Sequence, residues 1–110
     1  MVKIKRFDVF LVNLDPTIGS EIKKTRPAVI ISPDSMNLSR LKTVIIAPMT
    51  STIKDNFPTR ILTEFKDKQG QIALDQLGSI DRTRIVKKLG VIEREVQNKV
   101  LDLLSIIFQK

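Results

Sequence analysis

The chain has 110 residues, 42% apolar and 28% charged, a composition typical of one soluble globular domain that spans residues 1–110. Its 19 Lys and Arg outnumber its 12 Asp and Glu, which gives a net charge of +7. This charge indicates either a polyanionic partner, such as nucleic acid or an acidic protein, or a surface that is basic and merely solvated. The chain has no histidine, which excludes imidazole catalysis, and no cysteine, which excludes disulfides and thiolate metal sites. No apolar run approaches the roughly 20 residues of a membrane span, so we expect a cytoplasmic protein that does not enter a membrane.

The first half of the chain predicts three strands separated by polar connections. Residues 7–14 form an almost continuous apolar run, which indicates a largely buried strand, and Asp15-Pro16 ends it because proline lacks an amide hydrogen. β-branched residues predict two further strands at 28–32 and 43–49. Pro48 is expected at the end of the latter, where a missing ladder hydrogen bond is tolerated. The connections are expected at residues 17–25, 33–40 and 51–57.

The second half begins with further short strands. Residues 59–65 alternate between polar and apolar side chains, as a half-exposed strand does, and residues 66–70 read as a turn. A mostly apolar strand is expected at 71–77, and residues 79–90 are expected to add a short strand around a tight turn.

The last segment changes its period and predicts an amphipathic helix. Glu93 and Glu95 favour its positive N-terminal end, and Glu95 with Lys99 forms a favourable i, i+4 pair. Three apolar side chains off the main stripe indicate either a wide core-facing surface or a subunit contact: Leu101, Ile106 and Phe108. The apolar stripe itself consists of Ile92, Val96, Val100, Leu103, Leu104 and Ile107. Short strands followed by one helix predict an α+β domain with a small, strongly curved antiparallel sheet or barrel.

Candidate functional residues lie at the strand ends. Pro27 fixes its own φ and holds Arg26 extended, so Arg26 is either a fork for an anion such as phosphate or an ordinary surface cation. The hydroxyls of residues 50–52 can bind phosphate or cap a turn. Asp75, in a mostly apolar segment, needs a partner and can be an ion-pair member, a base or an acceptor for a nucleobase edge.

The order and spacing of these elements resemble the MazF/PemK family of toxin endoribonucleases, over nearly the whole chain. The motifs that carry the resemblance are Gly19-Ser20-Glu21, Arg26-Pro27-Ala28-Val29, Pro48-Met49-Thr50-Ser51, Asp75-Gln76 and Ile80-Asp81. The resemblance implies an SH3-like barrel with a C-terminal helix, a homodimer, and sequence-specific cleavage of single-stranded RNA without metal or other cofactor, which would inhibit translation. It also implies neutralisation by an acidic antitoxin protein, and DNA binding together with that antitoxin.

The resemblance also implies roles for individual residues. Arg26 would stabilise charge at the scissile phosphate, Thr50 would bind a phosphate oxygen, and Glu21 would be the base, on a flap formed by residues 16–25. The implied RNA contacts are Ser20, Lys23, Lys24, Ser51, Asp75 and Gln76. Some PemK-type relatives carry a histidine and an arginine where this chain has Ser20 and Ala73, so an Arg–Asp–His catalytic set cannot operate here.

Two other functions remain open from the sequence. A binding module for RNA or antitoxin that has lost catalysis would keep the same fold. The CcdB gyrase inhibitors share the barrel, but they are expected to act through a C-terminal Trp-Gly-Ile, whereas this chain has no tryptophan and ends at Phe108-Gln109-Lys110.

Overall fold

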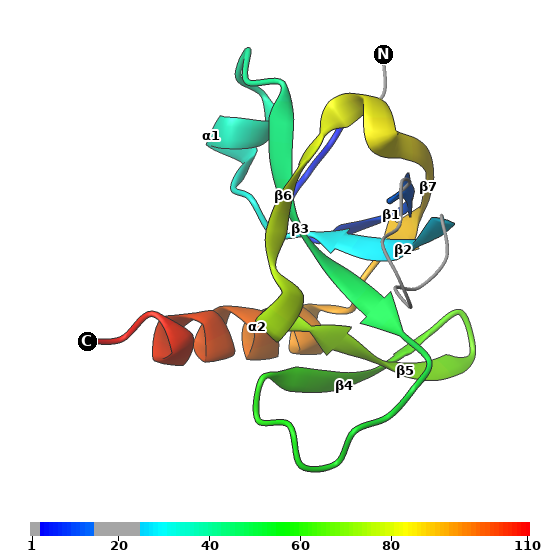
Figure 1. Ribbon diagram of the computed structural model, residues 1–110, viewed down its shortest axis with the longest axis vertical. Helices are drawn as coiled ribbons and strands as arrows, with labels where there is room; N and C mark the ends of the chain where they lie inside the picture. The colour runs from blue at the N-terminus through cyan, green and yellow to red at the C-terminus, as the bar shows by residue number, and fades with distance from the viewer. Residues whose placement is uncertain (1–2, 15–24) are drawn as a thin grey trace.

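The computed structural model describes residues 3–14 and 25–110, and in them seven strands form one curled antiparallel sheet (Figure 1). The strands follow the spatial order β4-β5-β3-β2-β1-β7, and β6 pairs with β3 beside this path. The strands are β1 (Asp8–Asn13), β2 (Thr25–Ile30), β3 (Thr43–Thr50), β4 (Arg60–Phe65), β5 (Lys68–Ala73), β6 (Gly78–Asp81) and β7 (Ile85–Val91). The helices are α1 (Asp34–Asn37) and α2 (Arg94–Ile107), with 3-10 turns η1 (Leu74–Gln76) and η2 (Arg82–Arg84). The α+β prediction is confirmed.

Both faces of the central strands β1, β2 and β3 are largely buried, which explains why these strands read as apolar runs in the sequence. Val9 and Phe10 are adjacent in β1, are both fully buried, and belong to two different clusters of the core. The cluster on the side of Val9 includes Val29, Ala47, Ile61, Ile72, Val96 and Val100. The cluster on the side of Phe10 includes Val12, Ala28, Ile30, Val44 and Ile46. The curl of the sheet therefore lets one short strand serve two layers of packing.

Helix α2 packs on the first of these clusters through Val96 and Val100, which are both buried (Figure 1). The off-stripe residues Leu101, Ile106 and Phe108 are 39%, 63% and 71% exposed, so they do not belong to a wide core-facing surface. Neither α2 nor α1 is long and apolar enough to cross a bilayer, and the described residues contain no other α-helix.

Strand β3 changes partners along its length, and this explains the position of Pro48. One edge of β3 pairs with β6 over residues 43–46 and with β5 from Met49 to Thr50. Pro48 falls between these two pairings, where no ladder hydrogen bond from its nitrogen is needed, so the strand continues past Pro48 to Thr50, one residue beyond the expected end. Thr50 is thereby placed at the last position of the strand rather than in a loop.

Other element boundaries also differ from the sequence-based prediction, and those of β2 and β5 have clear physical reasons. Strand β2 begins at Thr25, because β1 pairs with it as far as Asn13 opposite Thr25. Strand β5 begins at Lys68, since the β4–β5 hairpin needs only a two-residue turn, with φ of 51° at Lys66 and 64° at Asp67. The strand expected at 71–77 instead ends at Ala73 and continues as the 3-10 turn η1, so Asp75 lies in a turn and not in a strand.

Candidate active site

A cleft of about 740 Å³ opens beside the ends of β2 and β3 and the β4–β5 hairpin. Its apolar lining comes from Pro27, Met49, Phe65 and Leu89, and its cations are Arg26, Lys66 and Lys68. A second cleft of about 230 Å³ shares three residues with the first: Arg26, Thr50 and Thr52. An apolar surface bordered by cations and hydroxyls can accommodate a flat base and the phosphate attached to it.

Arg26 lies near the start of β2, opposite Val12 of β1, and its side chain is half-buried. Its Nε is buried without a hydrogen-bond partner, and the rest of the guanidinium donates to no residue that the structure describes. Burial lowers the pKa of the Arg26 guanidinium from its ordinary value, because the charged form loses contact with water. A buried donor without a partner is costly, so an anion in the cleft would satisfy groups that the protein leaves open.

Thr50 lies at the end of β3, paired with β5 on one edge and close to β2 on the other. The register that pairs Ala28 with Pro48 continues toward Arg26 and Thr50, and on the other edge Thr50 pairs with Gln71 of β5. The Thr50 hydroxyl oxygen accepts a hydrogen bond from the backbone N–H of Thr52 at 3.1 Å. The turn-capping interpretation of residues 50–52 is therefore confirmed, and the hydroxyl keeps its own hydrogen available for a ligand.

Gly70 and Thr63 pair across β4 and β5 and shape the floor of the larger cleft. A Cβ at Gly70 would lie 2.6 Å from the carbonyl oxygen of Thr50, so only glycine allows β5 to approach β3 this closely. Thr63 is 6% exposed, and its hydroxyl bonds to no residue that the structure describes. A buried hydroxyl on the wall of a cleft is suited to a polar group of a ligand.

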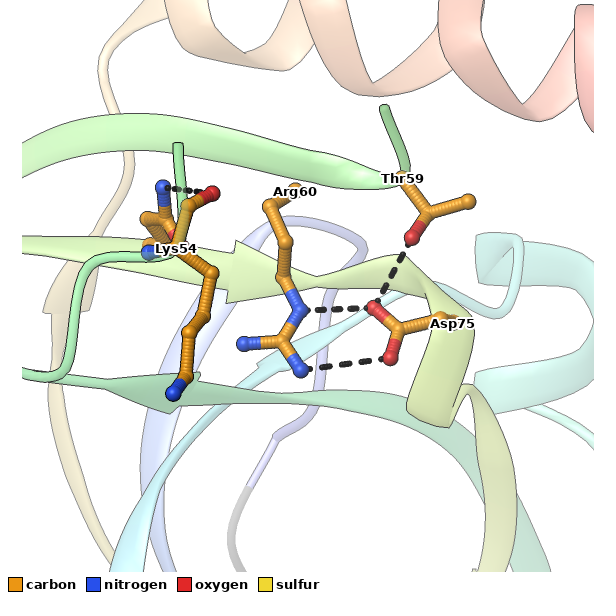
Figure 2. A network of polar contacts seen from close by, with 5 residues as sticks. Lys54, Thr59, Arg60 and Asp75 are labelled. Carbon is orange, nitrogen blue, oxygen red and sulfur yellow. Dashed lines mark hydrogen bonds and ion pairs between the residues drawn. The ribbon is translucent and has the colours of Figure 1, made fainter. Parts of the chain in front are cut away.

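Asp75 is a member of an ion pair (Figure 2). Its Oδ1 accepts from Nε of Arg60 at 2.7 Å and from the Thr59 hydroxyl at 3.1 Å, and its Oδ2 accepts from Nη2 of Arg60 at 3.2 Å. These hydrogen bonds, with Arg60 first, lower the pKa of the Asp75 carboxyl below its usual value. Of the three interpretations from sequence, the ion pair is confirmed, and a carboxylate so occupied is a poor base.

The other expected site residues divide into two groups. Ser51 lines the larger cleft and Gln76 the smaller, so both lie beside Arg26 and Thr50. Four expected residues lie outside the described part of the chain: Ser20, Glu21, Lys23 and Lys24. The sequence did not suggest Lys54 or Arg60, although both line the smaller cleft. Lys54 stands in a polar loop, and nothing local distinguishes it from other surface lysines.

Comparison with known proteins identifies the class. A family model described as PemK-like, MazF-like toxin of type II toxin–antitoxin systems matches residues 5–108. The chain belongs to this family, as the motifs around Arg26 and Thr50 indicated.

Solved structures agree in fold. The chain is 21% identical to MazF from Deinococcus radiodurans, with a TM-score of 0.81 and complete coverage of both chains. It is 23% identical to a chain of a MazE–MazF structure from the same organism, with a TM-score of 0.77 and coverage of 96% of each chain. A mycobacterial endoribonuclease in complex with its cognate antitoxin is 19% identical, with a TM-score of 0.76 over 96% of this chain and 93% of that one. The predicted MazF-like fold is thereby confirmed.

Proposed function

We propose that this toxin is an endoribonuclease that cleaves single-stranded RNA by attack of a ribose 2′-hydroxyl on its own 3′-phosphate. The observation that carries the proposal is the half-buried Arg26 guanidinium, which has no hydrogen-bond partner among the described residues and lies beside Thr50 at the junction of the two clefts. A guanidinium so placed matches a phosphodiester in charge and geometry. The endoribonuclease named among the structural neighbours supports the same class of substrate.

In the proposed reaction the 2′-oxygen bonds to phosphorus while the bond from phosphorus to the 5′-oxygen breaks. The 2′-hydroxyl proton passes to a base, and the leaving 5′-oxygen gains a proton, giving a 2′,3′-cyclic phosphate and a 5′-hydroxyl. No metal is needed, because the nucleophile belongs to the substrate. Arg26 stabilises the developing charge on the phosphorane, and Thr50 donates its hydroxyl hydrogen to a phosphate oxygen.

Glu21 is the proposed base. Its replacement by glutamine should lower turnover and leave RNA binding similar or slightly tighter, because a charge that repels phosphate is removed. Ser20, Lys23, Lys24, Ser51 and Gln76 are the proposed additional RNA contacts.

The proposed protein partners are a second copy of this chain and an acidic antitoxin. The exposed apolar residues of α2, Leu101, Ile106 and Phe108, offer a surface that a second copy can cover. The net charge of +7 suits an acidic antitoxin, and two of the structural neighbours are named as complexes with an antitoxin or MazE. Sedimentation at micromolar concentration should give twice the 12.5 kDa of one chain, and a monomer throughout would contradict the dimer.

The decisive experiment incubates the protein with a long single-stranded RNA and with DNA of the same sequence, both in EDTA. Cleavage of RNA alone, with 2′,3′-cyclic phosphate and 5′-hydroxyl ends, is the expected result. Arg26→Ala is the control for a contaminating nuclease, and Arg26→Lys should also be inactive because a point charge does not reproduce the guanidinium fork. Binding of RNA without cleavage would favour a non-catalytic module.

A further inference from the structure

The smaller cleft carries strong positive charge next to the proposed reaction centre. Arg26, Lys54 and Arg60 all line it, and none of its described lining residues is acidic. Three cations around a space of about 230 Å³ repel one another; the ion pair with Asp75 offsets part of this repulsion at Arg60, and an anion that enters relieves the rest.

Arg60 is held rigidly and still has donors to offer. Its side chain is 8% exposed, its Nε and Nη2 are bound to Asp75, and its guanidinium lies 5.1 Å from the centroid of the Phe57 ring. Its Nη1 donates to no residue that the structure describes. The protein has thus fixed one side of the guanidinium and left the other without a partner.

Lys54 is fixed through its backbone. The side-chain amide of Gln71, itself 5% exposed, accepts from the Lys54 N–H at 3.0 Å and donates to the Lys54 carbonyl at 3.3 Å. The Lys54 side chain forms no ion pair with a described residue, and in Figure 2 it extends along the side of Arg60 that faces away from Asp75. A loop lysine therefore lies beside a second cation, and no carboxylate of the described residues lines the space they share.

We propose that Lys54 and Arg60 form a binding subsite for a backbone phosphate adjacent to the scissile one, and that Asp75 is a positioning residue that aims Arg60 into this subsite. The proposal rests on the proposed RNA cleavage, because the scissile phosphate is what places the neighbouring phosphate. RNA is favoured over an acidic peptide because Arg26 and Thr50 border both clefts, so a strand bound at one continues into the other. The subsite binds the substrate before and during the reaction alike, so it acts on KM more than on kcat.

The test uses a short RNA that contains one mapped cleavage site, in which uncharged methylphosphonates replace the flanking phosphates one at a time. With wild-type protein, neutralising one flanking linkage should lower kcat/KM about tenfold, as expected when one charge-assisted hydrogen bond is removed. With Lys54→Ala, KM should rise by a similar factor, and the same methylphosphonate should have a smaller further effect than in wild type, because only Arg60 then contacts that phosphate. Lys99→Ala, on the outer side of α2, is the matched control and should keep the wild-type response.

Asp75→Asn separates a positioning role from a catalytic one. Without the Asp75 carboxylate, Arg60 is no longer held toward the subsite, so KM should rise and the effect of the methylphosphonate on kcat/KM should become smaller. The value of kcat and its pH profile should stay near those of wild type. A fall of kcat by orders of magnitude, with loss of one limb of the pH profile, would make Asp75 the base and overturn the positioning role.

Binding of a 2′-O-methyl RNA of the same sequence separates failure of the subsite from failure of the proposed cleavage. This RNA cannot react, so the response of its affinity to each methylphosphonate reports the subsite even if the wild-type protein cleaves nothing. An equal response of wild type and Lys54→Ala at every linkage would overturn the subsite. A Lys54→Ala variant that loses affinity for an Asp- and Glu-rich peptide, but not for any phosphate, would assign the cleft to a protein partner instead.

Discussion

Arg26 and Thr50 stand on neighbouring antiparallel strands, and their side chains border both clefts. The ladder that joins Val29 to Ala47 and Ala28 to Pro48 brings the two residues together although 24 positions separate them in the sequence. Arg26 offers a cation that no residue in the described part of the chain binds, and Thr50 offers a hydroxyl whose oxygen already accepts the Thr52 N–H. The pair is thus arranged to donate hydrogen bonds to one anion.

The first prediction concerns the Thr50 hydroxyl. Thr50→Ala should lower the rate of RNA cleavage by about 10²–10³, as removal of one preorganised donor does. Thr50→Ser keeps both the donor and the acceptor for the Thr52 N–H, so it should retain most of the rate. Single-turnover cleavage of one RNA by the two variants measures the difference, with melting curves as a check on folding. Equal loss in both variants would assign the effect to the methyl group and not to the hydroxyl.

The second prediction follows from the buried Nε of Arg26. Arg26→Met keeps the unbranched chain as far as the position of Nε but replaces a buried donor that no described residue satisfies with an apolar atom, so the free energy of unfolding should rise by about 1 kcal/mol. Cleavage should nevertheless be lost. Urea unfolding and a cleavage assay on the same preparation test both statements. A marked loss of stability would mean that Arg26 supports the fold and is not held at a cost for function.

The sequence predicted the fold well where a pattern is local. The apolar runs of β1 and β3 and the apolar stripe of α2 each depend on neighbouring residues only, and each element formed near the expected place. Element ends that depend on a partner strand were less accurate. The end of β5 at Ala73 is one example, because β3 pairs with β5 through only Met49 and Thr50, and η1 follows at once.

The candidate site could be predicted only where its residues belong to a local motif. Family motifs placed Arg26 and Thr50, but spacing alone does not reveal that two antiparallel strands bring them to one cleft. The sequence did not show the partner of Asp75, because Arg60 lies 15 residues earlier, in β4. Thr63 did carry a signal: in β4 it takes an inward position between Ile61 and Phe65, where an apolar residue is usual.

The third prediction is the pH dependence of the Asp75–Arg60 pair. The pKa of Asp75 in the folded chain lies below its ordinary value of 3.8, so the pair stabilises the fold fully above that value and loses its effect as the pH falls through the lower, folded pKa. Asp75→Asn should therefore be about 1 kcal/mol less stable than wild type at pH 7 and at pH 5, a modest size because the carboxylate is partly exposed. The difference should shrink below about pH 4.

Urea unfolding at several pH values measures this difference. Asp102→Asn is the control, since Asp102 is an exposed residue of α2 without an ion pair to any described residue, and it should show no such pH-dependent gap. A gap that persists unchanged at pH 3 would mean that the asparagine disturbs packing and that the charge is not the cause.

The fourth prediction concerns Lys23 and Lys24, the proposed phosphate-binding lysines of the segment before β2. Replacing both by alanine should weaken RNA binding about equally for every sequence. It should also flatten the dependence of log affinity on log salt by about 0.7 for each phosphate that the protein no longer neutralises. Affinities measured at four or more salt concentrations give the slope, with Lys99→Ala as the control. An unchanged slope would mean that the two lysines touch no phosphate and that Arg26 acts without them.

The last prediction tests the close approach of β5 to β3 with a pair of glycines. A Cβ at Gly70 would meet the backbone carbonyl of Thr50 at 2.6 Å, and a backbone atom cannot move aside without shifting its strand. Gly70→Ala should therefore lower the free energy of unfolding by about 1–3 kcal/mol and, because Thr50 moves with its carbonyl, should lower kcat as well. At Gly78 the nearest atom to an added Cβ is 3.8 Å away, so Gly78→Ala should change neither quantity appreciably. Urea unfolding and single-turnover cleavage of the two variants make the comparison. Similar stability and activity of Gly70→Ala and Gly78→Ala would show that β5 can move away from β3 without disturbing Thr50, and that the close approach of the two strands is not required.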